Sequence, residues 1–212
     1  MPRGRPITVS DDALLDAARD VFLEAGVGAT TAEIARRAEI SESVLFYRFK
    51  SKEALFEAVL ERQAKVPPVL RALRGRAGSG DLAQTLTEVG QSVADEIRSA
   101  MPLLMIASIM ARAGAWKVEE LRERMRRPHP SQRESLELLA GYLEAEAEAG
   151  RIRPVDAEIA ARVFLGSVVQ HVMSQHWLSV PDARPLSTPR FVRGLVDLLL
   201  AGLLPRRRER PR

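Results

Sequence analysis

The sequence contains no cysteine, few aromatic residues and no long uninterrupted apolar run. The absence of cysteine excludes a disulfide scaffold, a thiol nucleophile and a cysteine-based metal site. No apolar stretch reaches the roughly 18 uncharged residues that a membrane span requires. The first residues, MPRGRPITVSDD, lack the apolar segment of a signal peptide. We therefore expect a cytoplasmic protein with no membrane partner.

An excess of charge of one sign is also missing from most of the chain. The net charge of +4 arises in the C-terminal stretch RRRERPR, which holds five arginines and one glutamate. Without this stretch, the 32 basic and 28 acidic residues become 27 of each. Global charge is therefore no argument for nucleic-acid binding, and any such argument depends on where the charges lie. We expect residues 206–212 to form a basic, disordered tail.

Helical periodicity runs through almost the whole chain, and no run has the alternation of a strand. Ser10, Thr30, Ser41 and Ser51 each precede a helical pattern and are suited to be N-caps. The Pro67-Pro68 pair ends the fourth helix near Lys65, because proline has no backbone donor. Further helices are predicted over 81–99, 102–127, 131–148, 156–178 and 189–204. The sequence therefore predicts an all-α fold of about nine or ten helices, in two unequal parts that divide near Lys65.

The stretch SESVLFYRFK, Ser41 to Lys50, places aromatic and basic residues side by side. One side of a helix faces a core, so these side chains must divide between two environments. The expected core set of the second and third helices is Ile34, Ile40, Leu45 and Phe49. The outer face of the third helix then carries Ser43, Phe46, Tyr47 and Lys50. Two short helices joined by a tight turn, the second with such an outer face, are typical of a helix-turn-helix DNA-binding motif.

Charge supports this interpretation locally. Five basic residues and two acidic ones lie between Arg36 and Lys52, which suits phosphate contact. Any helical hairpin with a solvated charged rim can show the same pattern, so the motif alone leaves that alternative open.

The segment ATTAEIARRAEISESVLFYRFKSKEALFEAVL, Ala29 to Leu60, resembles the DNA-binding domain of the TetR family of tetracycline-repressor-like regulators. The passage AGRIRPVDAEIAARVFLG, residues 149–166, is similar to the start of the penultimate helix in the ligand-binding domains of that family. The resemblance implies a helix-turn-helix DNA-binding domain of three helices, followed by a larger helical ligand-binding and dimerisation domain. The expected boundaries are a flexible basic arm at 1–9, the DNA-binding domain at 10–65 and the second domain at 66–205.

The resemblance also implies roles for single residues. Thr31, Tyr47 and Lys52 are expected at phosphates, and Ser41, Ser43 and Val44 near base edges. Arg48 and Lys50 are expected to flank phosphates.

Two positions depart from the family pattern. Phe46 stands where tyrosine is usual, so a hydrogen bond to phosphate is lost and the ring is expected either to prop the recognition helix or only to pack. Glu39 stands at the usual turn glycine, which implies either a strained left-handed residue or a different turn.

The N-terminal PRGRP allows two interpretations. Arg3 and Arg5 can enter a narrow A·T minor groove, or the segment is a disordered, solubilising start.

Other function classes find less support in the sequence. The closely spaced histidines, His171 and His176, are five apart and so lie on different helix faces, unlike a zinc pair. The stretch GRAGSG lacks the lysine and hydroxyl of a phosphate loop. We therefore expect no metal, no cofactor and no catalytic residues. The alternatives are an all-helical enzyme for a small molecule and a minor-groove architectural protein.

The second part of the chain is expected to bind a ligand and to dimerise. Bulky apolar residues and a few polar ones are candidates for a mostly apolar effector pocket: Met101, Leu104, Met105, Met110, Trp116, Gln170, His171, Met173, Gln175 and Trp177. The last two helices carry apolar faces with Leu198 and the small residues Gly166, Gly194, Ala201 and Gly202, which predict a four-helix interface with a second copy. The expected function is a homodimeric, ligand-responsive regulator, most simply a repressor, that binds a pseudo-palindromic DNA operator and is released by a small, largely apolar effector.

Overall fold

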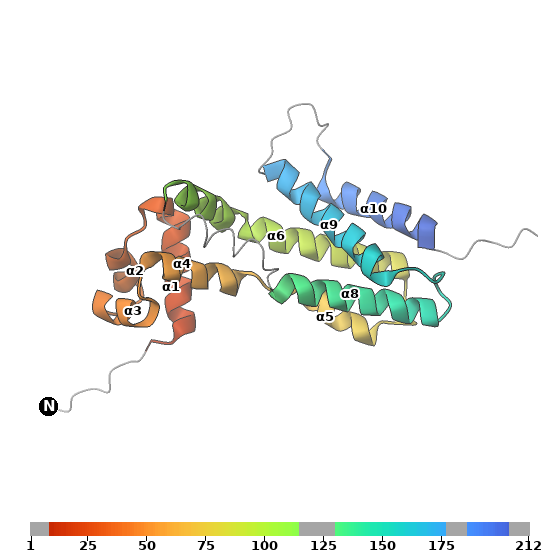
Figure 1. Cartoon of the computed structure of the whole chain (residues 1–212), viewed down its shortest axis with the longest axis horizontal. Helices are drawn as coiled ribbons and strands as arrows, with labels where there is room; N and C mark the ends of the chain where they lie inside the picture. Colours follow the sequence, from red (N-terminus) through yellow and green to blue (C-terminus); the bar gives the residue numbers. More distant parts are fainter. Residues whose placement is uncertain (1–8, 115–129, 177–185, 204–212) are drawn as a thin grey trace, which may run out of the picture. The chain divides into compact units, whose positions relative to one another are not determined.

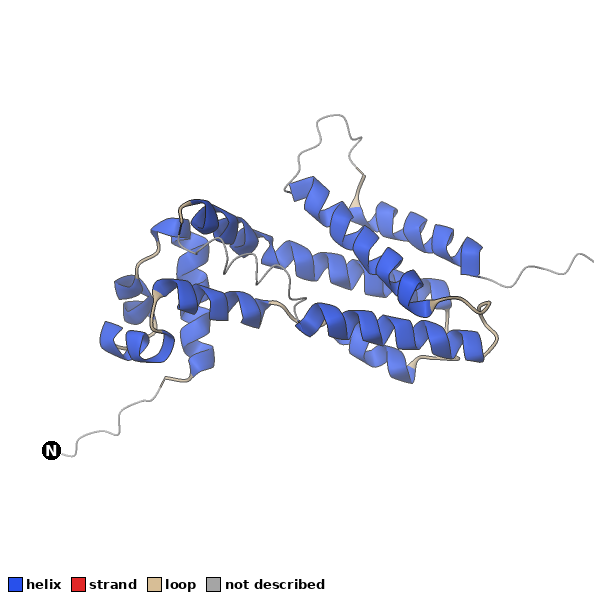
Figure 2. Cartoon of the chain, in the orientation of Figure 1, coloured by secondary structure: helices blue, strands red, loops and turns tan. Residues whose placement is uncertain are grey.

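The computed structural model describes residues 9–114, 130–176 and 186–203, and every regular element in these ranges is helical (Figures 1 and 2). The predicted all-α class is confirmed. The α-helices are α1 (Asp11–Ala25), α2 (Thr31–Arg37), α3 (Glu42–Phe49), α4 (Lys52–Gln63), α5 (Pro68–Ala72), α6 (Leu82–Arg112), α8 (Pro130–Glu148), α9 (Ala157–His176) and α10 (Thr188–Leu203), with two 3-10 turns, η1 (Gly26–Gly28) and η2 (Leu73–Gly75).

The four predicted N-caps of the first helices are confirmed. The side-chain oxygens of Ser10, Thr30, Ser41 and Ser51 each accept a hydrogen bond from the backbone N–H three residues later. Each bond satisfies a donor that would otherwise lack a partner in the first turn. Gly26 ends α1 with a φ of 58°, a conformation that favours glycine.

The chain divides into two compact units, and the first contains residues up to Ala64 together with the part of α6 from Ala100 onward. Within it, α1 packs against α2 and α4, and α3 packs against both α2 and α4. Phe22 and Phe56 meet edge to face at 4.7 Å in a core that includes Ile34 and Leu45. Ile40 and Phe49 pack against this core half-buried.

The C-terminal part of α6 contributes Leu103, Ile106 and Met110 to the core of the first unit. The sequence had assigned these residues to the second domain and had placed a helix break before Pro102. The structure instead has one continuous helix of 31 residues with Pro102 inside it. Met101 and Leu103, the neighbours of Pro102, are buried, and their packing offsets the one backbone hydrogen bond that proline removes.

The second unit contains α5, the first part of α6, α8, α9 and α10. Helix α9 packs against both α8 and α10 (Figure 1). A buried carboxylate, Glu146 on α8, holds the loop before α6 by accepting a hydrogen bond from the backbone N–H of Gly78 at 2.9 Å. Its second oxygen lies 3.1 Å from Nε of Arg151, so the buried charge is paired.

Candidate functional site

Helix α3 presents a polar and aromatic face to solvent. Leu45 is fully buried, whereas Ser41 and Ser43 are exposed and Val44 is 38% exposed. Tyr47 is 80% exposed, the most of the large apolar side chains that the structure describes. This face is exposed because only the opposite side of the short helix packs against the core.

Phe46 is 42% exposed, and the exposed Lys50 follows the last residue of the same helix as its C-cap. The ammonium group of Lys50 lies 5.3 Å from the ring centre of Tyr47 and donates to the carbonyl oxygen of that residue at 3.0 Å. The outer face therefore combines hydroxyl groups, a phenol, an exposed ring and one cation, the groups that bind phosphates and base edges.

The turn between α2 and α3 contains Glu39 with a φ of 56°. Of the two arrangements that the sequence allowed, the left-handed residue is the one present. A side chain at this φ is strained by about 1 kcal/mol relative to glycine. The turn is held by backbone hydrogen bonds from Glu39 to Arg36 and from Ile40 to Ala35.

Several cations near α3 already have partners inside the first unit. Lys52 donates to the carbonyl oxygens of Val27 at 2.9 Å and Ala29 at 2.7 Å. Arg48 donates to the carbonyl oxygen of Val9 at 2.7 Å and pairs with Asp11 at 3.1 Å.

Arg37 also has a partner, since it forms a two-pronged pair with Glu24 at 2.6 and 2.7 Å. That pair lowers the pKa of Glu24 through the hydrogen bonds from the guanidinium group. The five basic residues counted in the sequence therefore overstate the positive charge that is free to meet DNA.

Thr31 is engaged as well, because its hydroxyl donates to Oε1 of Glu42 at 2.6 Å. Glu42 begins α3 and is exposed. The sequence interpretation assigned no role to Glu42, although its place directly after the N-cap of the recognition helix was a signal for one. Arg3 and Arg5 lie outside the described residues.

The proposed ligand residues are divided between the two units. Those on α6 belong to the first unit, where Met101 and Met110 are buried, Leu104 is half-buried and Met105 is 48% exposed. Those on α9 belong to the second unit, where Gln170 and Gln175 are exposed and Met173 is half-buried. Trp116 and Trp177 lie outside the described residues.

His171 is the buried polar residue of this set. Its ring stacks on Phe191 of α10 with 4.1 Å between ring centres, and its Nε2 has no hydrogen-bond partner among the described residues. Burial lowers the pKa of His171, because desolvation disfavours the charged imidazolium. The neutral ring therefore predominates at neutral pH.

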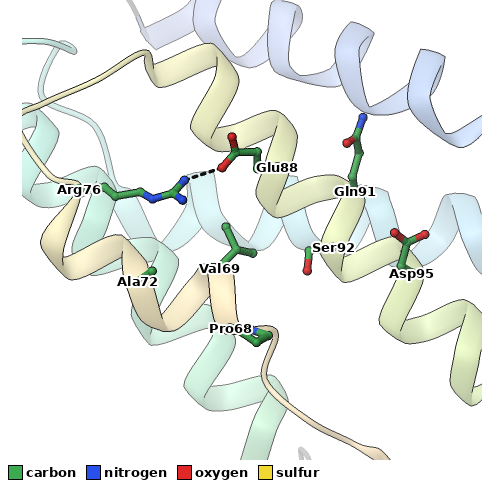
Figure 3. Close-up of a pocket in the computed structure, with 8 residues that line it drawn as sticks. All are labelled: Pro68, Val69, Ala72, Arg76, Glu88, Gln91, Ser92 and Asp95. Atoms are coloured by element: carbon green, nitrogen blue, oxygen red, sulfur yellow. Dashed lines mark hydrogen bonds and ion pairs between the residues drawn. The ribbon is translucent and has the colours of Figure 1, made fainter.

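A groove of about 570 Å³ lies in the second unit between α5 and the first part of α6 (Figure 3). One side is formed by apolar residues of α5 and by Arg76 after η2, and the other side is polar and comes from α6. It is lined by Pro68, Val69, Ala72, Arg76, Glu88, Gln91, Ser92 and Asp95. Its two carboxylates already have partners, since Glu88 pairs with Arg76 at 2.5 Å and Asp95 with Arg98 at 2.9 Å. None of the ligand residues proposed from the sequence lines it.

The side of α9 and α10 that faces away from the core of the second unit is rich in apolar residues, with the exposed Gln170 among them on α9. On α10, Val192 and Val196 point inward, whereas Leu198 is 76% exposed and Gly194, Ala201 and Gly202 share its side. On α9, Ile159 and Val163 are more than half exposed, and Gly166 follows them on the same side, before Val169, which is 41% exposed. A side chain added at Gly166, Gly194 or Gly202 would meet no atom within 4 Å.

Among the described residues no cluster of His, Asp or Glu is placed to hold a metal ion. In the same part of the chain no helix is both long and apolar enough to cross a membrane.

Comparison with known proteins adds two family matches. Residues 14–59 match the model of the bacterial regulatory proteins of the tetR family, and residues 84–202 match that of the C-terminal domain of AefR-like transcriptional repressors. The second match alone covers more than half of the chain.

Two relatives and one solved structure agree with these matches. The chain is 27% identical over 190 residues to the transcriptional regulator YvkB of Bacillus subtilis, covering 86% of this chain and 95% of that one. It is 28% identical over 158 residues to the A-factor receptor protein of Streptomyces griseus, covering 73% of this chain and 51% of the receptor. A regulator structure from Mesorhizobium loti, 18% identical, superposes with a TM-score of 0.73 over 92% of this chain and 96% of the other. This structural likeness concerns the fold.

Proposed function

The chain belongs to the TetR family of bacterial transcriptional regulators, and we propose that it is a ligand-responsive repressor that binds a pseudo-palindromic operator as a homodimer. The observation that carries the proposal is the outer face of α3, with Tyr47 80% exposed beside the exposed Ser43 and Val44. A short helix of this kind is accommodated by the major groove, which is about 12 Å wide. Repression is supported by the match of residues 84–202 to a repressor domain.

In the proposed docking, Tyr47 and Lys50 lie along a phosphate backbone while Ser43 and Val44 reach base edges. Ser41 already caps α3, so its hydroxyl contributes chiefly to the start of the helix. Arg48 and Lys52 mainly stabilise the fold of the DNA-binding unit, because both donate hydrogen bonds to its backbone carbonyl oxygens. Phosphate contacts set the register of the helix on DNA, and base contacts select the sequence.

The proposed dimer uses the outward apolar side of α9 and α10. A second copy that covers this side removes its exposed apolar residues from water, and the glycines let the helices of the two copies approach closely. A two-fold axis between the copies places two α3 helices on half-sites about one helical turn apart, on the order of 34 Å. Such an operator is an inverted repeat.

The proposed effector is a small, largely apolar molecule that binds the second unit. The unpartnered Nε2 of the buried His171 supports a ligand with one hydrogen-bonding group near α9. A relative of this chain is named the A-factor receptor protein, and a receptor role in a relative supports a bound ligand here. A coupling of roughly 1 to 3 kcal/mol between the two sites would lower operator affinity about 5- to 150-fold. The proposed place of action is the cytoplasm, where the operator is available.

Selection of bound duplexes from a random DNA pool tests the proposal. A dimeric repressor that presents two α3 helices to DNA enriches an inverted repeat. Enrichment of loose A·T tracts would instead identify a minor-groove architectural protein, and enrichment of nothing would contradict DNA recognition altogether.

Replacing Tyr47 by alanine tests the docking mode. Loss of one hydrogen bond of about 1 kcal/mol in each half-site weakens binding of the dimer to every duplex by about 30-fold and leaves the selected sequence unchanged. Tyr47→Phe isolates the hydroxyl. Unchanged affinity in both variants, measured by titration with the selected duplex, would remove Tyr47 from the interface.

A further inference from the structure

Glu42 is an acidic residue at the position where a recognition helix approaches DNA most closely. It is the first residue of α3, directly after the N-cap Ser41, and its side chain is exposed. The N-terminal residues of a recognition helix are the ones that contact base edges in the major groove. A carboxylate in that place also lies near phosphates of like charge, which is unfavourable unless DNA supplies a hydrogen-bond donor.

The carboxylate of Glu42 is held in a defined position. Its Oε1 accepts a hydrogen bond of 2.6 Å from the hydroxyl of Thr31, at the start of α2. The neighbouring hydroxyls of Ser41 and Ser43 bond to each other at 2.8 Å, and Ser41 also caps the helix. The second carboxylate oxygen of Glu42 makes no hydrogen bond among the described residues, so it is an ionised acceptor that can meet DNA beside the Ser43 hydroxyl.

The chemistry of the bases decides which donor that oxygen can meet. An ionised carboxylate only accepts hydrogen bonds. In the major groove, guanine presents N7 and O6 acceptors and thymine an O4 acceptor and a methyl group, so neither can donate. Adenine donates from N6 but places its N7 acceptor beside that group, where it repels a carboxylate. Cytosine donates from N4 and presents no acceptor of its own there.

We propose that Glu42 reads the N4 amino group of one cytosine in each half-site, and that Thr31 is its positioning residue. The proposal rests on the repressor function proposed above, and it assigns to Thr31 a role beyond the phosphate contact that the family resemblance implies. The hydroxyl of Thr31 holds one carboxylate oxygen, so the other is presented in a single orientation. Specificity then comes from an attraction to cytosine together with repulsion of the acceptors on the other bases.

Selection from a random duplex pool with the wild type, Glu42→Gln and Glu39→Gln tests the proposal. The wild type is expected to enrich an inverted repeat with cytosine at one symmetric position of each half-site. Glu42→Gln is expected to change the preference at that position alone toward adenine, because a glutamine amide both donates and accepts. Glu39→Gln removes the same charge from the neighbouring turn and is expected to leave the selected sequence unchanged.

Titration of duplexes that differ only at that base gives the size of the effect. Replacing the cytosine by thymine, with its partner changed to adenine, is expected to weaken wild-type binding about tenfold or more, and binding of Glu42→Gln by much less. Thr31→Val is expected to reduce the difference in affinity between the cytosine and the thymine duplex. Thr31→Ser, which keeps the hydroxyl, is expected to retain the wild-type difference. Equal loss on all duplexes in Thr31→Val would instead show a phosphate contact and overturn the positioning role.

An unchanged base preference in Glu42→Gln, within an inverted repeat, overturns the cytosine assignment while the repressor proposal stands. Failure of the wild type to enrich any inverted repeat contradicts both proposals. Thermal unfolding of each variant verifies that these surface changes leave the fold intact.

Discussion

The ammonium group of Lys52 connects the start of α4 to the loop before α2. Its two hydrogen bonds go to the carbonyl oxygens of Val27 and Ala29, at the end of η1, where the turn itself provides no backbone donor for them. The family resemblance implied a phosphate contact for this residue. The observed contacts add a role in holding the DNA-binding unit together.

We predict that Lys52→Met lowers the free energy of unfolding by about 1–2 kcal/mol, because the apolar stem remains and only the charged donors are lost. Urea unfolding measures this change. Lys50→Met is the matched control, since Lys50 is exposed and its ammonium donates to only one carbonyl oxygen, that of Tyr47 in the preceding helix α3. Equal stability of Lys52→Met and the wild type would return Lys52 to a role at phosphates alone.

His171 makes stability depend on pH. Burial lowers its pKa in the folded chain below the unfolded value of about 6.5, so the unfolded state binds the proton more readily. The stability that the neutral ring provides is therefore present above pH 6.5 or so, and it declines as the pH falls from there toward the lowered folded pKa.

We predict that His171→Phe flattens this decline. Phenylalanine keeps the stack on Phe191 and removes the unpartnered Nε2, so stability at pH 7 should be equal or higher by up to about 1 kcal/mol. Melting temperatures of both proteins between pH 5 and 8 measure the effect. The difference between the two proteins at each pH removes the contribution of the other histidines, which both proteins share. A variant that melts with the same pH dependence as the wild type would exclude His171 as the titrating group.

At the scale of elements, one glycine on α6 sets how closely three helices pack. A Cβ at Gly90 would lie 2.7 Å from Cγ1 of Val192 on α10 and 3.2 Å from Cζ of Phe164 on α9. Both neighbours are buried, and a close-packed interior leaves side chains little room to move.

We predict that Gly90→Ala destabilises the second unit by about 1–3 kcal/mol through overpacking. Gly141→Ala is the control: this glycine lies within α8, a Cβ there meets nothing within 4 Å, and the change should stabilise the helix by about 0.5–1 kcal/mol. Thermal unfolding distinguishes the two signs. Stabilisation by both variants would show that α9 and α10 yield to the added methyl group.

The sequence predicted most elements because their signals are local. Ser10, Thr30, Ser41 and Ser51 cap helices through bonds that span three residues, so their roles can be recognised without a tertiary structure. The break expected at Pro102 was wrong, because packing of the flanking residues outweighs the local preference of proline.

The contacts of the candidate site could not be predicted in the same way. Whether a lysine meets a phosphate or a carbonyl oxygen depends on backbone groups far away in the sequence: Lys52 lies 25 residues from Val27. The carboxylate of Glu42 and the hydroxyl of Thr31 are likewise 11 residues apart and meet only through the turn between α2 and α3. Sequence patterns indicate which face a residue occupies, and long-range packing decides its partner.

At the scale of the whole molecule, α6 belongs to both compact units. Its first part carries Gly90 among the helices of the second unit, and its last turns carry Ile106 and Met110 in the core of the first. Because α6 is one uninterrupted helix, it connects the proposed effector-binding unit to the DNA-binding unit without a loop. We propose that an effector changes operator affinity in part through this helix.

The outward side of α9 and α10 determines the assembly that the proposed function requires. In a single chain Gly194 is exposed, and a side chain there meets no atom within 4 Å. A glutamate at this position is therefore tolerated by the isolated fold. It is harmful only if a second copy covers the site, because the charge would then be buried without a partner at a cost of several kcal/mol, about 2–5.

We predict that Gly194→Glu converts a dimer into a monomer with an intact fold, and that Gly141→Glu, the same change at an exposed glycine of α8, leaves the dimer unchanged. Sedimentation at micromolar concentration gives the oligomeric state, and circular dichroism verifies the fold. Because one α3 helix alone offers a small reading surface, the monomer should lose tight binding to the inverted repeat and keep weak, salt-dependent binding to any duplex. A wild type that sediments as a monomer without DNA would contradict a preformed dimer, and a dimeric Gly194→Glu would move the interface to another side of these helices.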